Sequence, residues 1–290
     1  MILTFDIETI PDQRPGAYDR IFESITPPES YFNIPDSLKS DAAREKRAAE
    51  NQEKLQAWEI TRVEEAREKW KRTAIDPNAG QVVCVSWMID DEPVETAWSE
   101  NFADEFALLA ETFSRMAESV GEQRVDVCGH NVLGFDLPFM QRRAIVNGLR
   151  LPHWWPVLTK PWHDRVHDTL VMWNAGQRAT GGGSMDMICE LLGLPMKGSE
   201  FDDEEITLAD GSILLAKDMH GSHVWDVIDA GRADIVAAYC AGDVERTRRM
   251  YKRIAGSLNL GSFNGAGYQA TIDDDQADPR AQMLDEEIPF

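Results

Sequence analysis

The chain opens on an apolar segment that carries two acidic side chains, Ile-Leu-Thr-Phe-Asp-Ile-Glu at positions 2–8. Apolar residues on both sides of the acidic ones predict a buried strand near the centre of a sheet. Because the side chains of a strand alternate between its faces, Asp6 and Glu8 share one face, while Phe5 and Ile7 point into the core. Unpaired carboxylates are costly at such a place. The pair therefore either holds a divalent cation or forms an acidic strand end in solvent.

The pattern that follows predicts one α/β domain. A hairpin is expected from 81–89 and 93–99, a further strand at 124–129, and a short strand that runs into a helix at 165–173. A second hairpin is expected at 206–216. Apolar periodicity predicts helices at 102–119, 135–147, 185–193 and 232–257. This order gives a mixed sheet flanked by helices.

The domain is expected to span residues 1–260, with an insertion at 13–75. The insertion consists of a loop rich in proline and polar residues at 13–35, then a long mixed-charge helix at about 37–72. One stripe of this helix is apolar and predicts its packed face, namely Leu55, Trp58, Val63, Ala66 and Trp70. Residues 261–290 are polar throughout and are expected to form a flexible acidic tail.

The chain is acidic, with a formal net charge of −22 and a sequence pI near 4.6. This balance argues against a protein that binds by coating a phosphate backbone with Lys and Arg, so any contact with nucleic acid is expected to be local. The four cysteines are widely spaced in apolar stretches, which predicts buried thiols in a reducing cytoplasm. No signal peptide or membrane-spanning run is present, so a cytoplasmic protein is expected.

A second acidic pattern follows the strand at 124–129. A polar loop with Asn131 and Phe135 leads to Asp136, and Pro138 comes two residues later. An aspartate beside the end of this strand can approach the carboxylates of the first strand. Alternatively, Asp136 caps the following helix, with Pro138 in its first turn.

A third pattern, Tyr239-Cys-Ala-Gly-Asp243, lies on the last expected helix. Residues four positions apart project from the same helical face, so Tyr239 and Asp243 face a common neighbour. An aspartate there can complete a metal site, and a phenol can bond a metal-bound water. In isolation, the pair equally describes a tyrosine at the edge of a core and a surface aspartate.

Together, the three patterns resemble the DEDD (DnaQ-like) 3′-to-5′ exonucleases, in the subgroup with tyrosine in the last motif. The sequence looks most like stand-alone exonucleases similar to the proofreading domains of family B polymerases, with a particular likeness over 220–254. The resemblance covers about 1–12 and 80–257. It implies a ribonuclease H-like fold and hydrolysis of phosphodiester bonds at DNA 3′ ends, in replication, repair or recombination.

The resemblance also implies two divalent metal ions, Mg²⁺ or Mn²⁺, about 3.5–4 Å apart. One ion would be held by Asp6, Glu8 and Asp243, with Tyr239 orienting the attacking water. The second would be held by Asp6, together with Asp136 either directly or through a water molecule. Single-stranded DNA ends are the expected substrate, positioned by Asn131, Phe135 and the backbone of Thr9 and Ile10.

Other residues near these patterns have open roles. Arg142 and Arg143 either meet phosphates or form a solvated helix face. The tryptophans at 154–155 either pack in the core or stack on bases. Asp168, at another strand end, is expected to support the site or to be structural.

The last six residues form an acidic run that ends in an apolar tip. This tip resembles the C-terminus of bacterial single-stranded-DNA-binding proteins, which docks into basic, apolar pockets of replication and repair proteins. The resemblance implies that the tip binds such partners. The alternative is a solubilising tail that happens to end in phenylalanine. The expected partner-binding residues are Asp285, Glu286, Glu287, Ile288, Pro289 and Phe290.

Three rival functions are open. A 3′-to-5′ exoribonuclease would use the same catalytic residues and would differ in how it treats the 2′-OH. A non-catalytic adaptor could recruit repair proteins through the tail, but it would not need the four carboxylates and Tyr239. An endonuclease of the same fold would not need the Tyr-x3-Asp helix.

Overall fold

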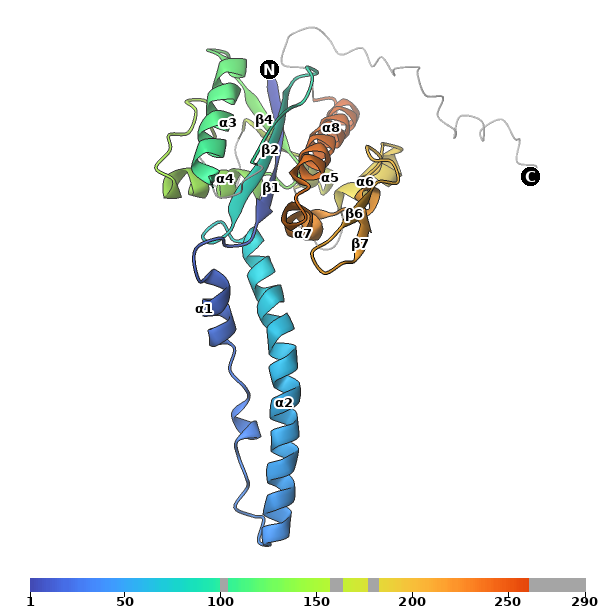
Figure 1. Cartoon of the computed structure of the whole chain (residues 1–290). Coiled ribbons are helices and arrows are strands. Elements are labelled where there is room, and N and C mark those ends of the chain that lie inside the picture. The colour runs from blue at the N-terminus through green and yellow to red at the C-terminus, as the bar shows by residue number, and fades with distance from the viewer. Residues whose placement is uncertain (100–103, 157–163, 177–182, 261–290) are drawn as a thin grey trace, which may run out of the picture.

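The computed structural model describes residues 1–99, 104–156, 164–176 and 183–260. They form an α/β domain from which one long helix, α2 (Asp41–Lys71), projects as a stalk (Figure 1). Among these residues, no helix is both long and apolar enough to cross a membrane.

The domain is built on a five-stranded sheet in the order β3-β2-β1-β4-β5. Central β1 (Ile2–Ile10) is antiparallel to β2 (Gln81–Ile89), which is antiparallel to β3 (Glu95–Trp98). On the other side, β1 is parallel to β4 (Asp126–Gly129), and β4 is parallel to β5 (Val166–Asp168). The prediction of a mixed sheet with a central first strand is confirmed.

One face of β1 contributes to a large apolar core. Phe5 and Ile7 point into it, as their alternation predicts, and pack with residues of α3 (Glu105–Val120) and α4 (Asp136–Val146). Trp154 and Trp155 are buried in the same core, so they pack and do not present a stacking surface for bases.

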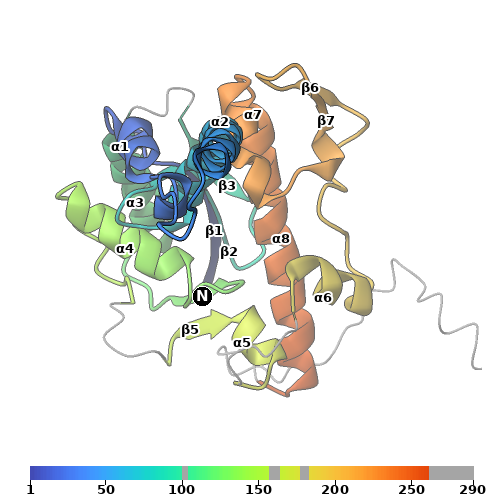
Figure 2. The same cartoon turned by 90° about the horizontal axis from the view of Figure 1, so that it is seen from below.

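The opposite face of β1 is covered by α8 (Ala233–Ser257) and α7 (Val224–Asp229). Ile10 packs here with Tyr239 and Cys240 of α8 in a second apolar cluster. Figure 2 shows the sheet lying between α3 and α4 on one side and α8 on the other. This face of β1 carries Asp6 and Glu8.

The remaining elements of the domain follow the predicted order. β5 leads directly into α5 (Thr169–Trp173), and the hydroxyl of Ser184 caps α6 (Met185–Leu192). β6 (Glu205–Thr207) and β7 (Ile213–Leu215) form the second hairpin. Short 3-10 turns lie at Glu29–Tyr31, Arg72–Ile75, Ala216–Asp218 and Gly221–His223. All four cysteines are buried free thiols, as predicted.

The insertion differs from its prediction in two respects. A helix, α1 (Ala17–Ser24), forms where a loop was expected, because it packs its aromatic residues against α2. Val63 was assigned to the packed stripe of α2, but it is 52% exposed. Arg62 takes that place instead, with its guanidinium 3.9 Å from the centre of the Phe22 ring and bonded to Phe22 O. Neither contact has a signal in the local sequence.

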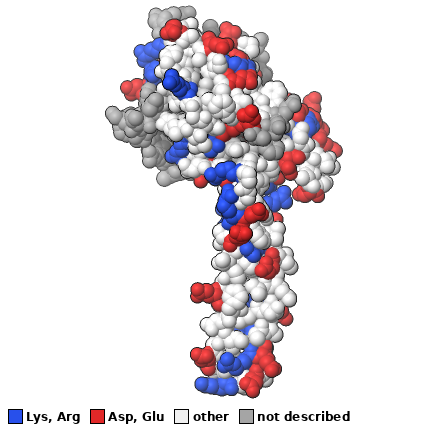
Figure 3. All heavy atoms as spheres, turned by 60° about the vertical axis from the view of Figure 1, so that its left-hand side comes forward, with Lys and Arg blue, Asp and Glu red and all other residues white. Residues whose placement is uncertain are grey.

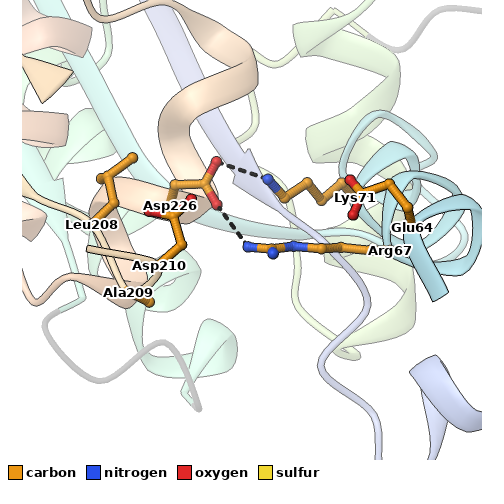
Figure 4. A pocket seen from close by; sticks show the side chains of 7 residues that line it. All are labelled: Glu64, Arg67, Lys71, Leu208, Ala209, Asp210 and Asp226. Atoms are coloured by element: carbon orange, nitrogen blue, oxygen red, sulfur yellow. Dashed lines mark hydrogen bonds and ion pairs between the residues drawn. The ribbon is translucent and has the colours of Figure 1, made fainter. Parts of the chain in front are cut away.

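The root of the stalk is fastened beside the end of β1. The Trp70 indole donates to Asp12 O at 2.9 Å and packs edge-on against Trp225 at 5.1 Å. Two basic side chains of α2, Arg67 and Lys71, reach Asp226 of α7 across a small polar pocket (Figure 4). The stalk therefore starts from a fixed position next to the strand that carries Asp6 and Glu8.

The stalk carries none of the net charge of the chain. Residues 13–75 contain 12 basic and 12 acidic side chains, so the formal charge of −22 lies outside them. Figure 3 shows the two signs interspersed along the stalk.

Candidate active site

Three carboxylates from two elements converge between β1 and α8. Asp6 and Glu8 on β1 and Asp243 on α8 each offer an oxygen, and these oxygens all lie within 4.8 Å of one another. Strand alternation puts Asp6 and Glu8 on one face of β1. The helix α8 packs on that face, where Cys240, three residues before Asp243, donates to Asp6 O at 3.5 Å. Glu8 and Asp243 are buried, and Asp6 is half-buried.

Asp136 lies beside this group and not within it. It is the first residue of α4, and its Oδ1 accepts a hydrogen bond from Ile7 N at 3.2 Å. The helix cap is Phe135, which makes no side-chain cap bond. Asp136 is therefore held against β1 by a tertiary contact, and the alternative that it caps α4 is wrong.

The carboxyl groups raise one another's pKa values. Burial, followed by the charge of Asp243, raises the pKa of Glu8 to about 8. Burial raises the pKa of Asp136 to about 7, although its backbone hydrogen bonds oppose the shift. The pKa of Asp6 is raised well above its ordinary value, first by burial and then by the charge of Asp136. Each group is held near charges of its own sign, which is unfavourable without a cation.

A lysine that the sequence analysis missed partly neutralises this cluster. Lys197 Nζ lies 2.6 Å from Asp243 Oδ2 and donates to Tyr239 Oη at 2.8 Å. Burial alone would lower the pKa of Lys197, but the charges and hydrogen bonds of Asp243 and Tyr239 raise it above its ordinary value.

The only local signal for Lys197 is the turn in which it lies. Gly198 has a φ of 79°, and a Cβ there would collide with the carbonyl oxygen of Lys217. A glycine is needed to bring this turn against the 216–218 segment. Nothing in that pattern identifies the preceding lysine as a partner of α8.

Tyr239 is 1% exposed and faces the cluster from α8, one turn before Asp243. Its pKa is raised by burial and then by the charge of Asp243, so the phenol keeps its proton at neutral pH. Since Lys197 donates to Tyr239 Oη, the phenol proton is free for another acceptor.

The loop with Asn131 and Phe135 is shaped by Asp168. The Asp168 carboxylate accepts from Asn131 N and Leu133 N, both at 3.0 Å, and also caps α5. Asn131 has a positive φ of 58° and an exposed side chain. Phe135 is half-buried, with its ring 5.3 Å from that of Phe139. Asp168 is thus a structural residue that fixes this turn.

Thr9 and Ile10 follow an irregularity in the central strand. The register between β1 and β2 shifts between Glu8 and Thr9. The side chains of Thr9 and Ile10 are buried, Ile10 completely. Their side chains therefore pack inside the domain, and contact of their backbone with a nucleotide stays a prediction.

Arg143 has a different place from the one expected. It is buried and forms a bidentate ion pair with Glu105, which ties α4 to α3. Both sequence interpretations of Arg143, a phosphate ligand and a solvated surface residue, are therefore wrong. Its neighbour Arg142 is exposed. The expected partner-binding residues, 285–290, lie outside the described residues and stay a prediction.

The donor set of the three-carboxylate group fits a hard divalent cation. It consists of carboxylate oxygens alone, which Mg²⁺ and Mn²⁺ prefer over sulfur or nitrogen ligands. Burial first, and then the neighbouring carboxylates, raise the pKa values of Asp6 and Glu8. A bound cation would relieve that repulsion.

Residues 79–207 match a family model described as a predicted 3′-5′ exonuclease related to the exonuclease domain of PolB. Over this segment the chain is similar to a family of hydrolases. The match includes Asp136 and Lys197, but not Asp6, Glu8 or Asp243. A comparison with curated proteins finds no match. Asp6 and Glu8 precede the matched segment and Asp243 follows it, and the fold brings the three carboxylates together.

Proposed function

We propose that this protein is a metal-dependent 3′-to-5′ exonuclease that hydrolyses phosphodiester bonds at DNA ends. The observation that carries the proposal is the group of three carboxylates at β1 and α8, with oxygens within 4.8 Å and Tyr239 on the same helix. The similarity of residues 79–207 to predicted exonucleases supports the direction of cleavage.

Asp6, Glu8 and Asp243 would hold one divalent ion. Asp136, whose Oδ1 is bonded to the amide of Ile7 next to Asp6, would share a second ion with Asp6. When bound, such ions supply a water of lowered pKa and stabilise charge on the scissile phosphate. Without such ions, the negative carboxylates would repel the phosphate group of a substrate.

Tyr239 and Lys197 would act on protons and orientation. Tyr239 stays protonated and has its O–H free, so it can donate to a water beside the cluster. Lys197 fixes the orientation of the phenol and of the Asp243 carboxylate through two hydrogen bonds. These two groups therefore position the nucleophile, and neither acts as a base.

The 3′-terminal nucleotide would lie between the end of β1 and the turn held by Asp168. The exposed amide of Asn131 offers hydrogen bonds there, and the partly exposed ring of Phe135 offers apolar contact. The backbone at Thr9 and Ile10 would line the other side. Because the chain is strongly acidic, few phosphates are expected to be contacted.

The test uses single-stranded DNA and RNA labelled at the 3′ or 5′ end, with Mg²⁺, Mn²⁺ or EDTA. Wild-type protein should release 3′-terminal nucleotides in either metal and none in EDTA. Asp6→Asn should be inactive, whereas Asp126→Asn, a buried aspartate of β4 outside the cluster, should retain activity. No degradation of any substrate by the wild-type protein would refute the proposal. Preference for RNA would keep the reaction and change the substrate.

A further inference from the structure

Arg246, on α8 just beyond Asp243, is 3% exposed and lies behind the carboxylate cluster. Its Nε and Nη2 donate to Asp243 Oδ1 at 3.2 and 2.8 Å. Its Nη1 and Nη2 donate to the two oxygens of Glu200 at 2.8 and 3.0 Å. Nη1 also donates to Met196 O at 3.3 Å. These bonds use the full donor capacity of a guanidinium.

The contacts join two parts of the site. Met196 O and Glu200 flank Lys197, whereas Asp243 belongs to α8. Arg246 therefore fastens the segment that carries Lys197 to the helix that carries Asp243. The Asp243 carboxylate is held from both sides, with Oδ1 on Arg246 and Oδ2 on Lys197.

Gly242 makes room for this arrangement. A Cβ at that position would lie 2.6 Å from Glu200 Oε1 and 2.8 Å from Arg246 Nη2. A side chain there would have to displace the ion pair. Gly242 is thus a second, independent place at which the pair can be disturbed without changing its members.

Arg246 acts by geometry more than by charge. Glu200 already balances its positive charge, so Arg246 adds little neutralisation to the cluster. What it supplies is a planar fork that fixes the direction of the Asp243 oxygens, which a lysine cannot reproduce. Groups that orient a metal ligand typically change metal affinity about 10- to 100-fold when removed.

We propose that Arg246 is a positioning residue, which orients Asp243 for metal binding and holds the Lys197 segment in place through Glu200 and Met196. This inference rests on the proposed function, since it takes Asp243 as a metal ligand. Because Arg246 is buried and its donors are all used, it would contact neither substrate nor metal directly. Its effect is on the affinity for the cation and not on the affinity for nucleic acid.

A purely structural role would give a different result, and the chain contains a matched control. Arg143 and Glu105 form another buried bidentate pair, between α3 and α4. Arg143→Lys and Arg246→Lys are the same chemical change in two buried pairs. Of the two arginines, only Arg246 is also bonded to a carboxylate of the cluster, that of Asp243.

The experiment measures Mn²⁺ binding to the full chain by calorimetry, together with thermal unfolding in EDTA. We expect Arg246→Lys and Gly242→Ala each to raise the Kd for Mn²⁺ about 10-fold or more. Arg143→Lys should lower the unfolding temperature and leave that Kd unchanged. In activity assays, Arg246→Lys should need more Mn²⁺, with KM for DNA unchanged and kcat restored at high Mn²⁺.

An unchanged Kd in Arg246→Lys, or an equal rise in Arg143→Lys, would overturn the inference. If Arg246→Lys fails to fold, Gly242→Ala decides the question by the same measurement. Should the wild-type protein bind Mn²⁺ but leave DNA intact, the proposed function fails, while the comparison of Kd values still tests Arg246. Absence of Mn²⁺ binding in the wild-type protein would refute both.

Discussion

The ammonium group of Lys197 lies 2.6 Å from Oδ2 of Asp243, a member of the three-carboxylate group. The same ammonium group donates to Tyr239 Oη and so joins the two residues of the last motif. Its positive charge lowers the pKa values of Asp6 and Glu8, against the larger effect of burial, which raises them. A loop lysine thus provides positive charge that the acidic motifs lack.

Replacement of Lys197 should separate metal binding from turnover. In Lys197→Met the ammonium group no longer competes with a metal ion for the Asp243 carboxylate. Mn²⁺ should therefore bind at least as tightly as in the wild-type protein. Turnover should fall at least about 10-fold, because Tyr239 and Asp243 lose a charged hydrogen-bond donor. Calorimetry and single-turnover cleavage measure the two effects. Weaker Mn²⁺ binding in this variant would contradict the competition.

Removal of the Tyr239 hydroxyl should affect the rate and not the metal. Tyr239→Phe preserves the packing of the ring but removes the proton that is free to orient a water. We expect kcat to fall about 10- to 100-fold, the KM for DNA to change little, and the Kd for Mn²⁺ to stay the same. Unfolding should become easier by about 1 kcal/mol, since Lys197 loses an acceptor. A kcat equal to that of the wild-type protein would exclude the hydroxyl from the reaction.

The raised pKa values predict how stability depends on pH without metal. Folding raises the pKa of Glu8 from its ordinary value near 4.5 to about 8, so the folded chain binds more protons than the unfolded chain between these values. The contribution of Glu8 to the free energy of unfolding is therefore complete below about pH 4.5. It decreases as pH rises toward 8, by on the order of 1 kcal/mol per pH unit.

Thermal unfolding in EDTA between pH 5 and 9 measures this effect. Glu8→Gln should show a shallower fall than the wild-type protein, because glutamine does not titrate. Saturating Mn²⁺ should remove most of the slope, since a cation favours the ionised carboxylates. A wild-type protein whose stability in EDTA rises over this range would contradict the predicted direction.

Asp168 offers a test of the turn that carries Asn131. Asp168→Asn weakens the acceptor of the Asn131 and Leu133 amides while keeping the shape of the side chain. We expect a higher KM for DNA, by about 10-fold, and an unchanged Kd for Mn²⁺, because in the proposed function this turn contacts the nucleotide, whereas the three carboxylates hold the metal. Steady-state kinetics and calorimetry check the two values. A change in Kd alone would mean that Asp168 serves the metal site.

The outer stalk should be dispensable for folding. Arg67, Trp70 and Lys71 at its root make the contacts with Asp12 and α7, so these remain when residues 27–57 are replaced by a short Gly-Ser linker. The deleted segment holds five basic and six acidic residues, so the net charge changes little. We expect an unchanged unfolding temperature and unchanged cleavage of short oligonucleotides. Trp70→Ala, at the root, should lower stability by about 2 kcal/mol.

Loss of activity on short oligonucleotides in the shortened protein would contradict this expectation. It would show that the outer stalk contributes to the site. Normal cleavage of short substrates with slower cleavage of long ones would locate its role beyond the end of the bound strand.

The sequence by itself determined which residues share a face. Alternation along β1 placed Asp6 and Glu8 opposite Phe5 and Ile7, and the four-residue spacing on α8 placed Tyr239 with Asp243. Apolar periodicity also gave the order of strands and helices in the domain, because each element buries one side regardless of its partner. These properties depend only on the geometry of a strand or a helix.

Only the tertiary structure decided which faces meet. Asp136 bonds Ile7 across 129 positions, and Lys197 meets Asp243 across 46. From the sequence, Arg143 was interpreted as a phosphate ligand or as part of a solvated helix face, but it pairs with Glu105 on a different helix. The helix α1 likewise depends on a distant partner, because its Tyr18 packs against Trp70 of α2. Local periodicity records that a residue is buried or exposed, but a hydrogen bond or ion pair between distant residues has no local pattern, so its partners become known only when the chain folds.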